Sequence, residues 1–300
     1  MWTMPVTSEK RKIFCDMGTK GELTFLGIGR SPRFSPNSVS RDDAILQAVA
    51  QELGRMGHVV NCVCEDDSRL PDGADGIFNM ARREDVLKRL MLAEEDGVRV
   101  LNSASALLKA SRSALTSLFQ QSGIPVPYTK SFSERGRRPD FPVWLKRGDA
   151  CAQTAGDVRF LHDEKELEAA MAEFRSAGIC DLLVCEHVEG DLVKFYGVEG
   201  TDFFYYYYPT AEPGFSKFGL EQINGVPSGF SFDVEDLKAC ADRSARLSGL
   251  TVYGGDCIVR SDGSFLLIDF NDWPSFSPCR DEAARAIACR LVESVTSMTR

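Results

Sequence analysis

Hydrophobic and polar positions in the first third of the chain follow two alternating patterns. Short apolar runs of strand length are followed by segments in which apolar residues recur at helical spacing. We predict strands at 23–29, 58–64, 76–80 and 98–102, and helices at 41–57 and 83–97. Strands that alternate with helices pair into a parallel sheet with helices on its faces, so this part is predicted to be an α/β domain.

The pattern changes after residue 102. Residues 103–123 have helical spacing and end at Gly123, so a single long helix is expected there. Two prolines keep 124–132 extended, and 133–140 is a polar, basic linker. We place a domain boundary in this region, near 102–125.

Beyond the linker, predicted strands follow one another with few helices between them. The strands are 142–146, 181–188, 192–198, 202–208, 252–259 and 264–270, and the helices lie near 163–177, 233–248 and 279–298. Strands that follow strands favour antiparallel pairing, so an α+β body is predicted for the rest of the chain.

The last predicted strand has two polar residues at its end. Asp269 and Asn271 are separated by one residue in "LLIDFNDWP" (266–274), and alternate residues of a strand point to the same face. Carboxylate and amide oxygens on one face suit Mg²⁺. A strand end that turns into a loop is the other interpretation, because Asn, Asp and Pro are common turn residues. This segment alone leaves both interpretations open.

Composition narrows the class of protein. The 300 residues are 43% hydrophobic and 26% charged, which is ordinary for a globular protein with ample core. A net charge of −9 argues against a nucleic-acid partner, because such proteins usually present a basic face. It does not argue against a small anionic ligand, since a local basic pocket can lie in an acidic protein.

Cysteines, histidines and the N-terminal segment give no sign of metal clusters or membrane targeting. The ten cysteines form no CxxC pair, which predicts reduced thiols rather than disulfides or zinc sites, and the three histidines have no ligand spacing. We find no secretory signal and no run near the roughly 20 apolar residues of a membrane span. A cytoplasmic protein without membrane contact is therefore expected.

Several polar residues follow apolar strands in a particular order along the chain. Lys146 ends "VWLK", Glu186 and Glu189 lie in "LLVCEHVEGD", Asp256 follows two glycines in "GGDCIV", and "LLIDFNDWP" closes the series. This order resembles the ATP-grasp superfamily, with its glutathione synthetase-like ATP-binding fold, over residues 23–290. The resemblance implies a pre-ATP-grasp α/β domain at 1–102 with a parallel sheet. Two α+β ATP-grasp lobes with antiparallel sheets would then follow, a central one at 103–185 and a C-terminal one with the metal site at 186–300.

The resemblance also implies ATP and Mg²⁺, or Mn²⁺ in its place, as cofactors. Lys146 and Arg112 would hold the nucleotide phosphates, although the family usually has Lys where this chain has Arg112. The adenine and ribose would lie against residues 186–189, and a metal ion would bind three side chains at the end of the chain's strands. The residues implied in these two roles are Glu186, His187, Val188 and Glu189, and Asp256, Asp269 and Asn271.

Two reactions are compatible with such a site. Most ATP-grasp enzymes are carboxylate–amine ligases that act through an acyl phosphate, and a minority are kinases that phosphorylate a hydroxyl. Lys194, in "DLVKFYGV", is expected to act on the transferring phosphoryl group, and a lysine there resembles the inositol phosphate kinase branch. We predict a ligase first, a small-molecule kinase as the alternative, and a non-catalytic nucleotide-binding protein as the least favoured interpretation.

The acceptor is expected to bind between the N-terminal domain and the metal site, where open parallel sheets bind ligands. A solvated loop is the plain alternative for the residues after the first strand, and Arg280, the second catalytic candidate, would alternatively begin the last helix as a surface charge. The substrate-binding candidates are Arg30, Arg33, Ser35, Asn37 and Lys217. The expected partners are ATP and a small-molecule acceptor, and the resemblance leaves a homodimer open.

Overall fold

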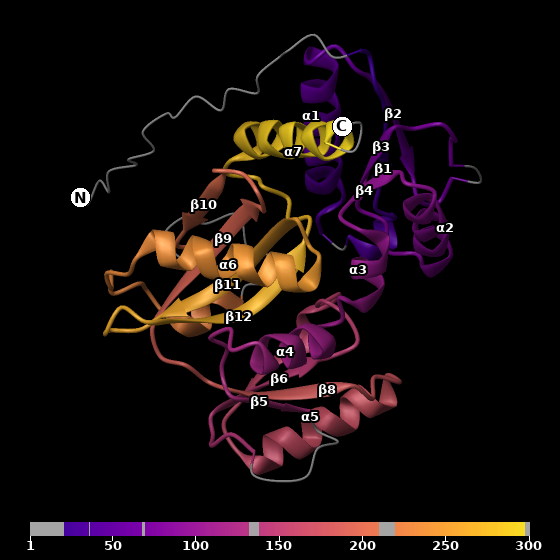
Figure 1. Ribbon diagram of the computed structural model, residues 1–300. Helices are drawn as coiled ribbons and strands as arrows, with labels where there is room; N and C mark the ends of the chain where they lie inside the picture. The colour runs from indigo at the N-terminus through magenta and orange to yellow at the C-terminus, as the bar shows by residue number, and fades with distance from the viewer. Residues whose placement is uncertain (1–20, 36, 68–69, 132–137, 210–219, 298–300) are drawn as a thin grey trace.

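The computed structural model describes residues 21–35, 37–67, 70–131, 138–209 and 220–297, and Lys217 therefore lies outside the described residues. Three four-stranded sheets, here called A, B and C in chain order, form the framework (Figure 1). Sheet A is parallel and sheets B and C are antiparallel. The predicted fold class, an α/β domain followed by α+β lobes, is confirmed.

Sheet A is built from the alternating strands and helices of the N-terminal region, in the order β2-β1-β3-β4. Its strands are β1 (Thr24–Gly29), β2 (Val59–Cys64), β3 (Gly76–Asn79) and β4 (Arg99–Leu101), and its helices are η1 (Pro32–Phe34), α1 (Val39–Arg55) and α2 (Glu84–Glu95). Because the strands are parallel, the loops after β1 and β3 emerge at the same edge of the sheet.

The single helix expected at 103–123 is wrong. The chain forms two helices instead, α3 (Ala104–Lys109) and α4 (Arg112–Gln121). The side-chain oxygen of Ser111 accepts a hydrogen bond from the backbone N–H of Ala114, so it caps a new helix start where the sequence pattern alone continues. Gly123, with φ +67°, ends α4 as expected.

Sheet B has the strand order β5-β8-β6-β7 and is covered by α5. Its elements are β5 (Thr129–Ser131), β6 (Val143–Arg147), η2 (Ala155–Asp157), β7 (Val158–Leu161), α5 (Glu164–Ser176) and β8 (Leu182–Glu186). The short strands β5 and β7 were not predicted. Asp163 accepts a hydrogen bond from the backbone N–H of Glu166 and so caps the start of α5.

Sheet C has the strand order β10-β9-β11-β12. Its elements, with the helices that accompany it, are β9 (Asp191–Val198), β10 (Phe204–Tyr207), η3 (Leu220–Asn224), α6 (Val234–Ser248), β11 (Val252–Val259), β12 (Phe265–Asp272) and α7 (Arg280–Thr296). Strand β12 continues through Asp269 and Asn271 to Asp272, two residues beyond the predicted end at residue 270.

Sheets A and C share their hydrophobic cores, whereas sheet B has its own. One core joins Ile28 and Ile77 of sheet A to Phe195 and Leu267 of sheet C. A second core packs α1 and α7 between the same two sheets, at the top of Figure 1. The third core consists of residues from sheet B and α5 alone.

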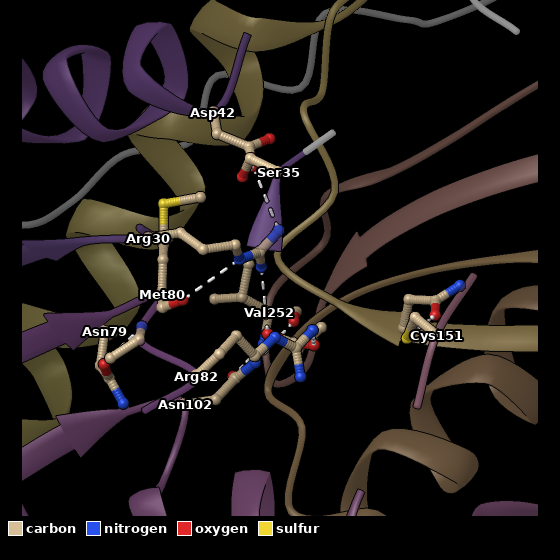
Figure 2. Close-up of polar contacts among 12 residues, drawn as sticks. Arg30, Ser35, Asp42, Asn79, Met80, Arg82, Asn102, Cys151 and Val252 are labelled. Carbon is tan, nitrogen blue, oxygen red and sulfur yellow. Dashed lines mark hydrogen bonds and ion pairs between the residues drawn. The ribbon is translucent and has the colours of Figure 1, made fainter. Parts of the chain in front are cut away.

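A side chain also links sheets A and C directly. Asn102, which follows β4 and is fully buried, donates from Nδ2 to the carbonyl of Val252 at 2.8 Å. Its Oδ1 accepts from the Val252 N–H at 2.7 Å (Figure 2). The amide thereby bonds both backbone groups of the first residue of β11, whose carbonyl also accepts the Trp273 N–H at 3.2 Å.

Two observations concern membrane-spanning helices and disulfides. Among the helices of the described residues, none has the length and apolar character needed to cross a membrane. No disulfide joins the cysteines within the described ranges.

Candidate active site

One large cavity lies where the three sheets meet. Its volume is about 590 Å³, within the range of small-molecule sites. Strands β6 and β7 of sheet B and β9, β11 and β12 of sheet C line it, and it reaches the loops that follow β1 and β3.

The end of the cavity between sheets B and C is apolar. Val158 lies on one wall, and Val188, Leu192 and Ile258 form a small buried cluster on the other. Trp144 also lines this end, and its indole N–H donates to Nδ1 of His187 at 3.2 Å. Apolar side chains facing one another across a slot suit a flat aromatic ring such as a nucleobase.

The residues at 186–189 hold different positions relative to this slot. Glu186 lines the cavity, and its Oε1 accepts the backbone N–H of Tyr128 at 2.8 Å. Val188 is buried in the wall. Glu189 is exposed, and neither it nor His187 is among the residues that line the cavity. Burial lowers the pKa of His187, so this ring is neutral near pH 7.

The three predicted metal ligands lie side by side. Asp256 of β11 is directly opposite Asp269 of β12 in the strand register, and Asn271 is opposite Gly254. The Nδ2 group of Asn271 donates to Oδ2 of Asp269 at 3.1 Å, as expected for side chains on one face. Two carboxylates and an amide oxygen are therefore gathered on one patch of sheet C.

Lys194 lies beside this patch. Its Nζ donates to both carboxylate oxygens of Asp256 at 3.0 Å and lies 3.4 Å from Oε1 of Glu221. Burial alone would lower the pKa of the Lys194 ammonium, but the charges of Asp256 and Glu221 raise it above its ordinary value. Burial raises the pKa of Asp256, and the Lys194 charge opposes that rise. The ammonium is thus a permanent charge next to the carboxylates.

Asp269 is flanked by two further cations. Arg112 NH2 lies 3.6 Å from its Oδ2, and Lys146 Nζ donates to the neighbouring carbonyl of Ile268 at 2.9 Å. Burial alone would raise the pKa of Asp269, but the charges of Arg112 and Lys146 outweigh it and hold this pKa below its usual value. Arg112 Nε is buried and makes no hydrogen bond. Asp269 is therefore ionised, and Arg112 retains an unused donor.

The loop after Lys146 is held in a defined conformation. Oδ2 of Asp157 accepts the backbone N–H groups of Gln153 at 2.7 Å and Thr154 at 3.0 Å. Gly148 lies so close to Ser113 that a Cβ there would be 2.1 Å from its Oγ, which explains the glycine. The thiol of Cys151 donates to Oδ1 of Asn271 at 2.8 Å, so this loop contacts the metal-ligand patch.

The acceptor-binding candidates are separated by the structure. Arg30 and Ser35 line the cavity and both bond Asp42, while Arg30 also bonds the carbonyl of Met80 (Figure 2). Arg33 stacks on Phe34, and Asn37 uses its carbonyl to accept from Arg41, and neither residue lines the cavity. Arg280 begins α7 and also lies outside the cavity lining, with a buried Nε that makes no hydrogen bond.

Sequence reasoning missed several charged residues around the cavity. Glu65, fully buried, accepts backbone N–H groups from the loops after β1 and β3. Arg82 lines the cavity and pairs with Asp272, which also pairs with Arg30. Asp191 accepts backbone N–H groups at 228–230. Position after a parallel strand was an available signal for Glu65, which directly follows β2, and for Arg82, in the loop after β3.

The donor set of the patch fits a hard divalent cation. Within the described ranges, no group of three or more His, Cys, Asp or Glu side chains is arranged to hold a metal ion. The patch contributes two carboxylates and one amide oxygen instead. Mg²⁺ is commonly held by one or two carboxylates together with water and substrate phosphates, so this smaller set suits it.

Comparison with solved structures identifies the architecture. The D-alanine–D-alanine ligase from Bacillus anthracis, solved with ATP, matches with a TM-score of 0.63 and 10% identity, over 92% of this chain and 98% of that chain. A RimK domain ATP-grasp protein from Sphaerobacter thermophilus matches with a TM-score of 0.62 and 18% identity, over 89% and 99%. The ATP-grasp ligase PsnB, solved with a minimal precursor, matches with a TM-score of 0.57 and 17% identity, over 91% and 99%.

The chain therefore has the ATP-grasp fold, as its sequence pattern indicated. No protein-family model and no curated protein matches it, so this likeness rests on structure.

Proposed function

We propose that this chain is an ATP- and Mg²⁺-dependent ligase that joins a carboxylate to an amine through an acyl phosphate. The observation that carries the proposal is the gathering of Asp256, Asp269 and Asn271 with three cations in one cavity. The apolar slot at the other end of the same cavity suits adenine. The solved neighbours that are ligases support the same reaction class.

The nucleotide would lie across the cavity, with adenine between Val158 and the Val188–Leu192–Ile258 cluster. Glu186 and the backbone of His187 and Val188 would face its polar edge. Glu189, three residues after Glu186, would bind the ribose hydroxyls. Lys146 and Arg112 would hold the phosphates, because both already lie next to Asp269. We also propose the domain division 1–102, 103–185 and 186–300.

The chemistry would need little more than positioning and charge. Asp256, Asp269 and Asn271 would hold the Mg²⁺, which neutralises charge on the nucleotide phosphates when bound. An oxygen of the acceptor carboxylate would attack the γ-phosphorus as the bond to ADP breaks. Lys194 would stabilise charge on the transferring group. The amine would then attack the acyl carbon, release phosphate and lose a proton, so no side-chain nucleophile is required.

A phosphotransferase is the second candidate. The observation that favours it is Lys194 itself, since an ammonium is a point charge, while a guanidinium holds an acyl phosphate through two parallel hydrogen bonds. In that reaction a hydroxyl of the acceptor would attack the γ-phosphorus, and ADP would leave.

The test is ATP consumption by the full chain with Mg²⁺, followed by ³¹P NMR. One panel supplies carboxylates with amines, and a second supplies phosphorylated polyols. Inorganic phosphate that appears only when a carboxylate and an amine are both present supports the ligase. A new phosphomonoester without free phosphate would replace the ligase by the kinase. No consumption of ATP with either panel would count against both.

A further inference from the structure

We infer that the acceptor carries a second carboxylate, apart from the reacting one, and that Arg82 anchors it at the end of the cavity beside sheet A. The inference rests on the proposed ligase function and names its substrate class: a short dicarboxylate. Arg82 lines the same cavity as Asp269 and Asn271, although it comes from the loop after β3.

A buried carboxylate holds the loop that carries Arg82. Oε2 of Glu65 accepts the backbone N–H of Arg82 at 2.8 Å and of Arg83 at 2.7 Å. Its Oε1 accepts the backbone N–H of Ser31, in the loop after β1, at 2.6 Å. One buried carboxylate therefore ties together the two loops that face the cavity, so Arg82 is positioned before any ligand arrives.

Arg30 and Arg82 both pair with Asp272 but differ in what remains available. The side chain of Arg30 is 10% exposed, and Nε, NH1 and NH2 donate to Met80, Asp42 and Asp272. The Arg82 side chain is 21% exposed, and its NH2 donates to Asp272. A guanidinium has five N–H donors, so Arg82 retains donors that face the cavity. Arg82, rather than the predicted Arg30, is suited to bind a carboxylate.

The charges at this end of the cavity balance, but the cations are more exposed than the acids beside them. Asp272 is 2% exposed and pairs with Arg30 and Arg82, Asp42 also pairs with Arg30, and the buried Glu65 acts on Arg82 through its charge. Arg41, on the first turn of α1, is half-buried, lines the same end of the cavity and donates to the neutral carbonyl of Asn37. Three acids therefore balance three arginines, and Arg82 and Arg41 are the charged groups that a bound anion would meet.

The room in the cavity limits the size of the acceptor. Arg82, Lys194 and the metal-ligand patch line one cavity of about 590 Å³, which the nucleotide would also occupy. A molecule whose reacting carboxylate lies at Lys194 and whose second carboxylate lies at Arg82 must therefore be short. Succinate, glutarate and aspartate have this form.

Direct binding tests the anchor without any reaction. Calorimetric titration of the full chain, with ADP and Mg²⁺ present, would compare succinate, glutarate and L-aspartate with butyrate, valerate and 2-aminobutyrate of equal chain length. We expect at least one dicarboxylate to bind at least tenfold more tightly than its monocarboxylate partner. In Arg82→Gln that dicarboxylate should bind at least tenfold more weakly, while the affinity for ADP changes less than twofold.

Two further variants separate anchoring from folding. Arg82→Lys keeps the charge and loses the fork, so its dicarboxylate affinity should be intermediate. Arg83→Gln is the matched control, because Arg83 pairs with Asp66 and Asp85 outside the cavity, and it should bind as the unchanged chain does. Absence of binding by all three dicarboxylates, equal binding of the monocarboxylates, or unaltered binding by Arg82→Gln would overturn the inference.

Hydroxylamine in place of the amine tests the proposed function separately, since an acyl phosphate would be trapped as a hydroxamate. Dicarboxylate binding without hydroxamate formation would support the role of Arg82 and contradict the ligase function. Hydroxamate formed equally well from monocarboxylates would support the ligase function and contradict the role of Arg82.

Discussion

Two groups of carboxylates lie in and around the cavity, and their main hydrogen-bond partners differ. The rim carboxylates, Glu65, Asp157 and Asp191, are buried and accept hydrogen bonds from backbone N–H groups of the surrounding loops, and Asp157 also pairs with Arg147. The floor carboxylates, Asp256, Asp269 and Asp272, depend on lysine and arginine side chains.

The different partners imply that the rim carboxylates stabilise the loops and that the floor carboxylates take part in catalysis. A backbone N–H cannot leave its carboxylate unless the loop itself moves, so a rim carboxylate fixes a loop. A lysine or arginine can exchange its carboxylate for a ligand at smaller cost, because both groups remain charged and can find new partners. The floor should therefore control catalysis, and the rim should control stability.

The largest expected effect is at the floor. Asp269→Asn removes a charged metal ligand, so we expect ATP turnover to fall about 10³-fold while the circular dichroism spectrum is unchanged. Asp262→Asn, in the exposed turn between β11 and β12, is the control and should retain turnover. Turnover of Asp269→Asn close to that of the control would remove Asp269 from the metal site.

A comparable change at the rim should act on stability instead. Glu65→Gln presents an NH₂ group to backbone N–H donors that now meet a carboxylate, so we expect a loss of about 2–3 kcal/mol in the free energy of unfolding. Urea denaturation measures it. Glu84→Gln, which removes an exposed pair with Lys88, should cost less than about 0.5 kcal/mol. Equal losses in the two variants would contradict the supporting role of Glu65.

Lys146 tests whether floor cations are exchangeable. Its Nζ donates to the neutral carbonyl of Ile268, which it can give up for a phosphate. Lys146→Met should therefore raise the KM for ATP about 10- to 30-fold, as expected for one lost charged hydrogen bond. Steady-state kinetics measures this change, with the exposed Lys165→Met as control. An unchanged KM for ATP would show that Lys146 does not reach the nucleotide.

The smallest expected effect depends on pH. Burial alone would raise the pKa of Asp157, but the N–H groups of Gln153 and Thr154 hold it below its usual value. A carboxylate whose folded pKa is depressed contributes stability above its unfolded pKa, near 3.9, and loses it as the pH falls through the folded pKa. Asp157→Asn should thus be less stable by about 1–2 kcal/mol at pH 7 and equally stable well below pH 4. A difference that persists in acid would contradict this assignment.

The sequence was informative where function depends on local pattern. Alternation of strands and helices predicted sheet A, and the two-residue spacing of Asp269 and Asn271 placed them on one face, as their hydrogen bond shows. The break between α3 and α4 was missed because the apolar spacing continues across Ser111. Only the hydrogen bond from the Ala114 N–H to the Ser111 side chain reveals the new helix start. Strand β5 has the polar sequence TKS, and an arginine interrupts β7, VRFL, so neither forms an apolar run in the sequence.

The contacts that complete the site could not be predicted in the same way. Arg82 and Asp272 are separated by 190 positions, and Glu65 lies in a polar loop whose composition indicates only a turn. Arg30 was predicted because it directly follows the first strand, and Arg82 was not among the predicted residues. Which of the two arginines can bind a ligand depends on how many of its N–H donors are already used in tertiary contacts. A single sequence does not contain this information.

The hydrogen bonds between Asn102 and Val252 have a mechanical consequence. Together with the shared cores, they resist displacement of sheet A relative to sheet C, whereas sheet B and α5 have an interior of their own. We therefore expect any change in the width of the cavity to displace sheet B and α5 relative to the other two sheets. Such a displacement would move Lys146, on β6, relative to the metal-ligand patch on sheet C.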